Sequence, residues 1–325
     1  MKYHTNMRFR NLLALYAVVS VLHMVKARDD DELRYAIKNG AETELNVRVV
    51  DDQGTAIRDA QIDAFFDSAL NAKGEIKRYI SDTNGFVIVS GRTGKAVSLR
   101  VTKYGYYGST DEVCYVSMGQ GVKNGEWCPK GLERNIVLNR IKNPKAIKTI
   151  VSNGKYTHVI GKWLGFDIEK YDFVIPNGNG SIADFEVKFE WDGLRGERFN
   201  GMNMDIRFKE PFSGAYYYER SMQSDFKDAY NASTNALYQK NFTFYSRPIR
   251  SSTGEIIARD RQLFDFTKTL VVRSRCVLDE NAFLKSARYS EICDLSFGCG
   301  RKGAWIMFQP IFNPVPNDTN LEPKR

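Results

Sequence analysis

The stretch that decides the fold is residues 49–62, which read Val49-Val50-Asp51-Asp52-Gln53-Gly54-Thr55-Ala56-Ile57-Arg58-Asp59-Ala60-Gln61-Ile62. Apolar and polar residues alternate up to Val49, and the alternation resumes at Ala60 after a turn-forming run from Asp51 to Gly54. Acidic residues beside a glycine are typical of tight turns, because Asp side chains hydrogen-bond to the nearby backbone and glycine adopts positive φ without strain. The stretch therefore predicts a strand, a turn and a second strand with Ala60 and Ile62 on one face.

A second turn of this kind is predicted at residues 81–86, Ser81-Asp82-Thr83-Asn84-Gly85-Phe86. Short alternating runs separated by turns continue from Glu44 to Leu138. Such a series suits one β-sandwich of about 100 residues. Before it, residues 28–43 are predicted to form a short helical lead-in, acidic at its start and ended by Gly40.

The chain is predicted to continue through a linker at 140–145 into a second β-rich domain of unknown function at 146–325. Its clearest strand is residues 183–191, where Phe185, Val187, Phe189 and Trp191 fall on one face. Residues 224–238 are expected to hold a helix or a long loop. The overall prediction is an all-β protein with two β-sandwich-type domains in tandem, the sandwich at 44–139 being the first.

Residues 1–27 have the composition of a cleavable signal peptide, with basic residues first, an apolar run from Leu12 to Leu22 and a small residue at Ala27. We therefore expect an exported protein that is periplasmic, extracellular or at the cell surface, with no membrane span in the mature chain. An uncleaved N-terminal anchor is the alternative.

The formal net charge of +8 overstates the basic character of the mature chain. The leader holds four Lys and Arg residues and no Asp or Glu, so its removal lowers the charge from +8 to +4. The other basic residues are interspersed with acidic ones, and no block of like charge suits a phosphate backbone. Nucleic acid is therefore not a predicted partner.

All five cysteines lie beyond the leader, and disulfides are their expected use in an exported protein. Cys114 and Cys128 flank a glycine-rich loop, and closing that loop would contribute about 3 kcal/mol. We predict a disulfide between them. The pairings of Cys276, Cys293 and Cys299 stay open, and one of these thiols is left over.

Residues 45–107 resemble the carboxypeptidase regulatory-like domain, a transthyretin-like seven-stranded sandwich found on bacterial exported proteins. The resemblance rests on Asp51 to Ile62, on Thr83-Asn84-Gly85 and on Gly105-Tyr106. It implies a transthyretin-like or Ig-like first domain but no peptidase activity, because the zinc peptidase part of that family is missing. The remainder resembles an uncharacterised extension that follows this domain in exported bacterial proteins.

Candidate catalytic chemistry is sparse. His158 is the one histidine beyond the leader, so neither a histidine-based zinc site nor a Ser-His-Asp triad is predicted. Asp82 starts a run that resembles a calcium loop, but the twelfth position is Thr93 rather than Glu. No catalytic residue, metal site or cofactor is therefore predicted.

Paired carboxylates offer the main catalytic alternative. Asp184, Glu186 and Glu190 lie on the polar face of one predicted strand at spacings used by glycosidases. Lys188 interrupts the row, and any solvated strand gives the same spacing, which favours an ordinary surface.

Two aromatic features are candidate binding residues. Tyr216, Tyr217 and Tyr218 form the densest aromatic run, and Trp127 lies in the loop between Cys114 and Cys128. We therefore predict a secreted or periplasmic, non-catalytic binding or scaffolding protein whose partner is a carbohydrate or a cell-envelope protein. The alternative is a carbohydrate-active enzyme, or its accessory domain, that uses surface carboxylates.

Overall fold

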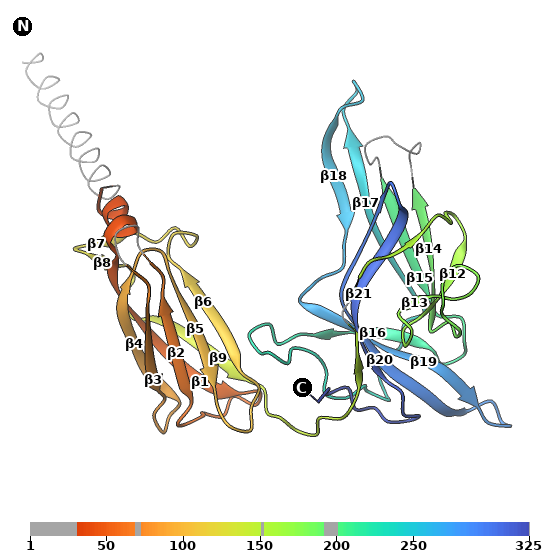
Figure 1. Ribbon diagram of the computed structural model, residues 1–325, viewed down its shortest axis with the longest axis horizontal. Coiled ribbons are helices and arrows are strands. Elements are labelled where there is room, and N and C mark those ends of the chain that lie inside the picture. Colours follow the sequence, from red (N-terminus) through yellow and green to blue (C-terminus); the bar gives the residue numbers. More distant parts are fainter. Residues whose placement is uncertain (1–30, 69–72, 151–152, 192–200, 325) are drawn as a thin grey trace, which may run out of the picture. The chain divides into compact units, whose positions relative to one another are not determined.

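The computed structural model describes residues 31–68, 73–150, 153–191 and 201–324, and these residues are almost entirely β-strand. They divide into two compact units. The first runs to Ile141 and includes Gln223–Phe226, and the second comprises Lys142–Met222 and Lys227–Arg325. The all-β prediction is confirmed. Figure 1 shows the strands of each unit in sequence colours.

The first unit is a sandwich of two sheets. Its strands are β1 (Ala41–Asp51), β2 (Gln61–Phe66), β3 (Glu75–Ile80), β4 (Phe86–Thr93), β5 (Ala96–Thr102), β6 (Ser109–Cys114), β7 (Val122–Lys123), β8 (Glu126–Trp127) and β9 (Leu132–Leu138). One sheet has the order β3-β2-β5-β6. In the other, β1 pairs antiparallel with β4 on one side and parallel with β8 and then β9 on the other. Seven of these strands have six residues or more.

The alternating residues of the opening stretch form the core of this sandwich. Leu45, Val47 and Val49 of β1 and Ala60 and Ile62 after the turn are completely buried. The prediction that Ala60 and Ile62 share one face of the second strand is thereby confirmed. Period-two alternation places one side chain in two against the facing sheet, and burial of those apolar side chains is the main force that holds the sheets together.

Both predicted turns form through Asp side chains. Asp51 Oδ1 accepts hydrogen bonds from the backbone N–H groups of Gln53 and Thr55 at 3.0 and 2.8 Å. Asp82 Oδ1 accepts in the same way from Asn84 and Phe86, both at 2.8 Å. This use of the Asp82 carboxylate explains the calcium-loop resemblance as turn chemistry.

A helix covers the described residues 31–39 and ends at Gly40, which has φ +81°. The Gly40 N–H donates to the Ala36 carbonyl at 2.7 Å, as expected of a glycine just past a helix end. The predicted leader, residues 1–27, lies outside the described residues. None of the described helices combines the length and the apolar composition that a membrane-crossing helix requires.

The second unit contains two six-stranded sheets. Its strands are β10 (Lys148–Thr149), β11 (Lys155–Thr157), β12 (Trp163–Asp167), β13 (Asp172–Phe173), β14 (Phe185–Trp191), β15 (Met202–Arg207), β16 (Gly214–Glu219), β17 (Asn241–Arg250), β18 (Ile256–Gln262), β19 (Lys268–Leu278), β20 (Leu284–Gly300) and β21 (Gly303–Asn313). One sheet has the order β10-β21-β20-β19-β16, with β11 also on β21, and the other has the order β13-β12-β14-β15-β17-β18.

An aromatic core fills the space between these sheets. Phe166 is its centre, stacked on Phe185 at 5.3 Å and in edge contact with Phe173 at the same distance. A smaller core lies on the opposite face of β19 and β20, where Val271 and Tyr289 pack with Tyr238. The β19–β20 layer is therefore buried on both faces.

The predicted helix or loop at 224–238 is an irregular segment with isolated bridges and turns, without a helix. Its first residues belong to the first unit, which the sequence did not indicate. There Asn139 Nδ2 donates to the Phe226 carbonyl at 2.7 Å, and the Phe226 ring lies 5.0 Å from Tyr107.

The predicted Cys114–Cys128 disulfide is not present, and all five cysteines are free thiols in this structure. Each of the two thiols has a local partner instead. Ser117 Oγ donates to Cys114 Sγ at 2.9 Å, and Cys128 Sγ lies 3.8 Å from the Glu126 carbonyl. The loop between them is held by the β7–β8 pairing, so its closure does not depend on a covalent bond.

Candidate functional site

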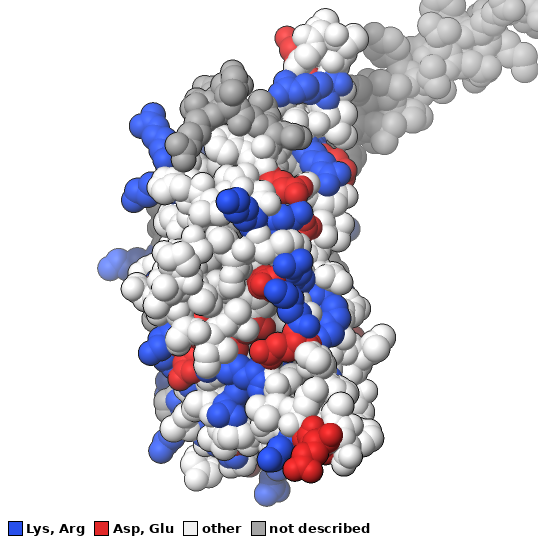
Figure 2. Space-filling view, turned by 90° about the vertical axis from the view of Figure 1, so that its right-hand side faces the viewer, with Lys and Arg blue, Asp and Glu red and all other residues white. Residues whose placement is uncertain are grey.

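The carboxylates proposed as a catalytic pair are engaged in ion pairs. Glu186 on β14 accepts from Arg207 Nε at 2.6 Å and lies 3.3 Å from Lys209 Nζ. Glu190 accepts from Lys188 Nζ at 2.6 Å. The face drawn in Figure 2 likewise shows acidic and basic side chains interspersed. These contacts are those of a solvated sheet surface.

Asp184 is buried and belongs to a different network. Its carboxylate accepts from the Ile168 N–H at 2.7 Å, from Ser274 Oγ at 2.7 Å and from Arg275 Nε at 2.9 Å. Consecutive strand residues normally point to opposite faces, but β19 shifts register after Ser274 and Arg275 has φ +50°. Both side chains therefore reach one carboxylate. Burial raises the pKa of Asp184, and Arg275 opposes that increase.

The three candidate tyrosines do not share one surface. The Tyr216 hydroxyl accepts from the Ser233 N–H at 2.9 Å, and its ring makes an edge contact with Tyr238 at 5.2 Å. Tyr217 points to the other face of β16, against Phe242 at 5.6 Å. Tyr218 packs with the smaller core. Binding by these tyrosines stays a prediction.

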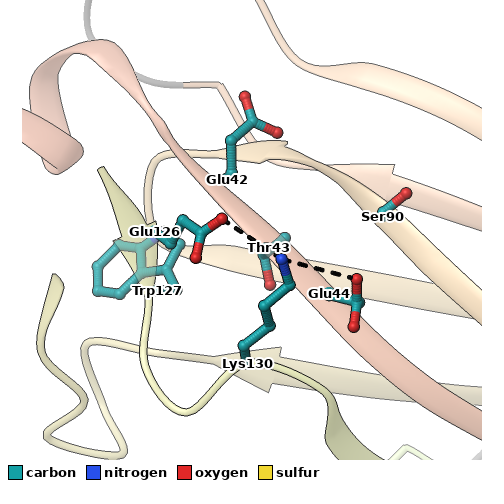
Figure 3. Close-up of a pocket in the computed structure, with 7 residues that line it drawn as sticks. All are labelled: Glu42, Thr43, Glu44, Ser90, Glu126, Trp127 and Lys130. Atoms are coloured by element: carbon teal, nitrogen blue, oxygen red, sulfur yellow. Dashed lines mark hydrogen bonds and ion pairs between the residues drawn. The ribbon is translucent and has the colours of Figure 1, made fainter. Parts of the chain in front are cut away.

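Trp127 lies beside a pocket at the β8 end of the first unit. Its indole is 1% exposed, stacks on Tyr115 at 5.0 Å and donates from Nε1 to the Thr93 carbonyl at 3.1 Å. We call this pocket, of about 160 Å³, the acidic hollow; Figure 3 shows the residues that line it, Glu42, Thr43, Glu44, Ser90, Glu126, Trp127 and Lys130.

The position of these side chains follows from the β1 pairing. Glu42 and Glu44 are two residues apart, so both project from the outer face of the sheet, and the β1–β8 register places Glu126 opposite Glu42. The Lys130 ammonium lies 3.4 Å from Glu126 and 4.0 Å from Glu44, and Glu42 lies 3.4 Å from Arg92. The hollow thus concentrates carboxylate acceptors around a single inward ammonium group (Figure 3).

A second hollow of about 230 Å³ is lined by residues of the 31–39 helix and of the β7–β8 hairpin. Its acidic wall comes from Asp31 and Glu32 of the 31–39 helix, and Gly125 closes it at the hairpin. The Asn124 N–H donates to Glu32 Oε2 at 3.0 Å, which fastens the hairpin to the helix.

One further cluster of ligand-type side chains occurs among the described residues. Asp228, Glu291 and Cys293 each offer one ligand atom within 4.8 Å of the others. His158, the histidine considered for a triad, is exposed just past β11.

The sequence pointed to Trp127 and its loop but missed the residues gathered around them. Glu42 and Glu44 look like ordinary polar positions of an alternating strand, and only the parallel β1–β8 pairing brings Glu126 to them. The cluster of Asp228, Glu291 and Cys293 was missed because more than 60 residues separate Asp228 from the other two.

No protein-family model matches the chain, and no curated protein matches its sequence. Among solved structures, 3-chlorocatechol 1,2-dioxygenase of Rhodococcus opacus is 12% identical over 32% of this chain and 62% of its own, with a TM-score of 0.25. The chain thus spans less than two thirds of that enzyme.

Two other structures cover more of the chain. BcpA, the major pilin subunit of Bacillus cereus, is 12% identical over 82% of this chain and 95% of its own, with a TM-score of 0.23. A Bacteroides uniformis protein assigned as carbohydrate-binding is 9% identical over 85% and 98%, with a TM-score of 0.18. At these TM-scores the likenesses carry no argument about function.

Proposed function

We propose that this chain is an exported, non-catalytic binding protein that holds a carbohydrate of the cell envelope through the acidic hollow. The observation that carries the proposal is the convergence of Glu44 and Glu126 on Lys130 beside Trp127. Export is supported by the composition of residues 1–27.

The chemistry of the hollow favours a neutral, hydroxyl-rich ligand. Lys130 already supplies a cation to two of the carboxylates, so a second cation is less favoured than a group that both donates and accepts hydrogen bonds. Sugar hydroxyls do both. The volume of about 160 Å³ is below the roughly 300–1,000 Å³ of pockets for drug-sized ligands, so it suits one sugar residue of a longer chain.

A non-catalytic role is supported by the state of the acidic residues on β14. Glu186 and Glu190 each have a cationic partner at 2.6 Å. A general acid must be able to transfer a proton and a nucleophile must be able to attack the substrate, and an ion pair opposes both.

A glycan array probed with the purified chain lacking residues 1–27 tests the proposal. Binding to an envelope-type glycan is expected, with a loss of at least tenfold in affinity when Glu44→Gln and Glu126→Gln are combined. Glu133→Gln, an exposed position on β9 of the same sheet, is the matched control and should bind normally.

Unchanged binding by the double variant, or an array without any bound glycan, would refute the proposal. A panel of chromogenic glycosides run alongside addresses the enzyme alternative. Turnover that is lost in Glu186→Gln or Glu190→Gln would replace the binding role by a catalytic one.

A further inference from the structure

One strand and an irregular segment bring three acidic groups together inside the second unit. Glu291 and Cys293 lie two residues apart on β20, so they share the face that carries the smaller core. The segment after β16 covers this face and supplies Asp228. Glu291 is 0% exposed and Cys293 is 2% exposed.

The cluster holds more acidic groups than cations. Asp228 Oδ1 lies 2.8 Å from Arg220 Nε, and the same guanidinium donates from Nη1 to Asp294 Oδ1 at 2.6 Å. Arg220 is therefore shared by two carboxylates. No ion pair joins Glu291 to a cationic side chain within the part of the chain that the structure describes.

Glu291 also has an oxygen that the protein leaves unsatisfied. Its Oε1 accepts from the Ala229 N–H at 2.9 Å, whereas Oε2 is buried and has no hydrogen-bond partner among the described residues. A buried polar atom without a partner costs free energy and calls for an explanation such as an ion. This oxygen belongs to the same side chain that faces Asp228 and Cys293.

We propose that Asp228, Glu291 and Cys293 form a buried binding site for zinc(II). A cysteine sulfur selects zinc over magnesium or calcium, and three protein ligands leave one position for water. Thr269 Oγ1 lies 3.0 Å from Cys293 Sγ, where it orients the sulfur.

Ion binding at these residues is coupled to proton release. Burial raises the pKa of Glu291 well above its ordinary value, and the neighbouring Asp228 raises it further. Burial and the same carboxylate raise the pKa of the Cys293 thiol. Binding of the dication forms metal–oxygen and metal–sulfur bonds to the deprotonated ligands, and the protons that these ligands carried leave to solvent.

The test is a zinc titration of the reduced, chelator-treated chain by calorimetry in buffers of different ionisation enthalpy. One zinc per chain is expected, with proton release and a higher unfolding temperature. Cobalt(II), used as a spectroscopic probe, should give a thiolate-to-cobalt absorption band.

Glu291→Gln is the decisive variant, because glutamine has the shape of a protonated glutamic acid and should leave the fold intact. Its zinc affinity should fall by at least about 10–100-fold, which is the loss expected when a residue that only supports a metal ligand is replaced. Cys293→Ala should abolish the cobalt band. Cys276→Ala and Cys299→Ala, on β19 and β20 outside the cluster, should keep both properties.

The proposal is overturned if the folded chain takes up no stoichiometric zinc, which would mean that Arg220 alone balances the cluster. It is equally overturned if Glu291→Gln and Cys293→Ala bind zinc normally while Cys114→Ala or Cys128→Ala does not. That result would place the ion at the β8 end of the first unit.

Discussion

Arg275 and Asp184 form a two-point contact inside the second unit, with Arg275 Nε donating to Asp184 Oδ1 at 2.9 Å and Nη2 donating to Oδ2 at 3.1 Å. The same guanidinium also donates to Asp167 at 2.9 Å and to Glu169 at 2.6 Å. One cation on β19 thus fixes the residue that precedes β14, the end of β12 and the turn after it.

Arg275→Met should destabilise the second unit by about 3–5 kcal/mol, because it leaves the Asp184 carboxylate buried without its cation. Urea unfolding followed by tryptophan fluorescence measures the loss, since three of the four tryptophans lie in this unit. Arg207→Met, whose Glu186 partner lies on the surface, is the control and should cost about 1 kcal/mol. Equal losses would contradict a structural role for the buried network.

Gly85→Ala should destabilise the first unit more than Gly54→Ala. Both glycines have positive φ, +73° and +79°, so each alanine costs about 1 kcal/mol of backbone strain. A Cβ at Gly85 would also lie 2.3 Å from the Val49 carbonyl oxygen, whereas a Cβ at Gly54 meets no atom within 4 Å. The clash should add about 1–3 kcal/mol. Calorimetric unfolding of both variants gives the difference, and equal melting temperatures would count against the close approach.

All five cysteines should titrate as thiols in the denatured, unreduced protein. In the folded protein at pH 8, Cys276 and Cys293 should be alkylated slowly, because burial raises the pKa of Cys276 to about 11 and raises that of Cys293 as well. Mass spectrometry after timed alkylation measures both. A peptide linked through Cys114 and Cys128 would instead restore the disulfide predicted from the sequence.

In metal-free protein, Glu291→Gln should become more stable relative to the parent chain as the pH rises. Burial raises the folded-state pKa of Glu291 above the unfolded value of about 4.3, so the native state binds the extra proton. The parent chain therefore loses stability as the pH increases above about 4, by at most about 1.4 kcal/mol per pH unit. Urea unfolding of both proteins between pH 4 and pH 7 measures the difference, and parallel stability curves would show that Glu291 is ionised in the fold.

Local patterns were sufficient to predict some of the strands. The alternation of Phe185, Val187 and Phe189 predicted β14, and all three side chains are buried. The Asp82 and Gly85 turn formed as expected, because its hydrogen bonds lie within five residues. The Cys114–Cys128 disulfide was predicted from spacing and compartment, neither of which reports where the two sulfur atoms point.

The candidate sites could not be predicted in the same way. Glu126 reaches Glu42 through a parallel pairing across 84 positions, and Asp228 reaches Glu291 across 63. Sequence spacing carries no signal for such contacts, because they depend on strand order in the sheet and on the path of irregular segments.

The sequence by itself determined that this chain is built from strands, that turns form at Asp51 and Asp82, and that Ala60 and Ile62 share a buried face. Each of these follows from interactions between near neighbours and from period-two burial. Only the tertiary structure decided which charges meet. Packing between distant segments produces the register shift beside Arg275, the position of Asp228 over β20 and the cluster of carboxylates around Lys130. Removing a charge from water is costly unless that packing also brings it a partner.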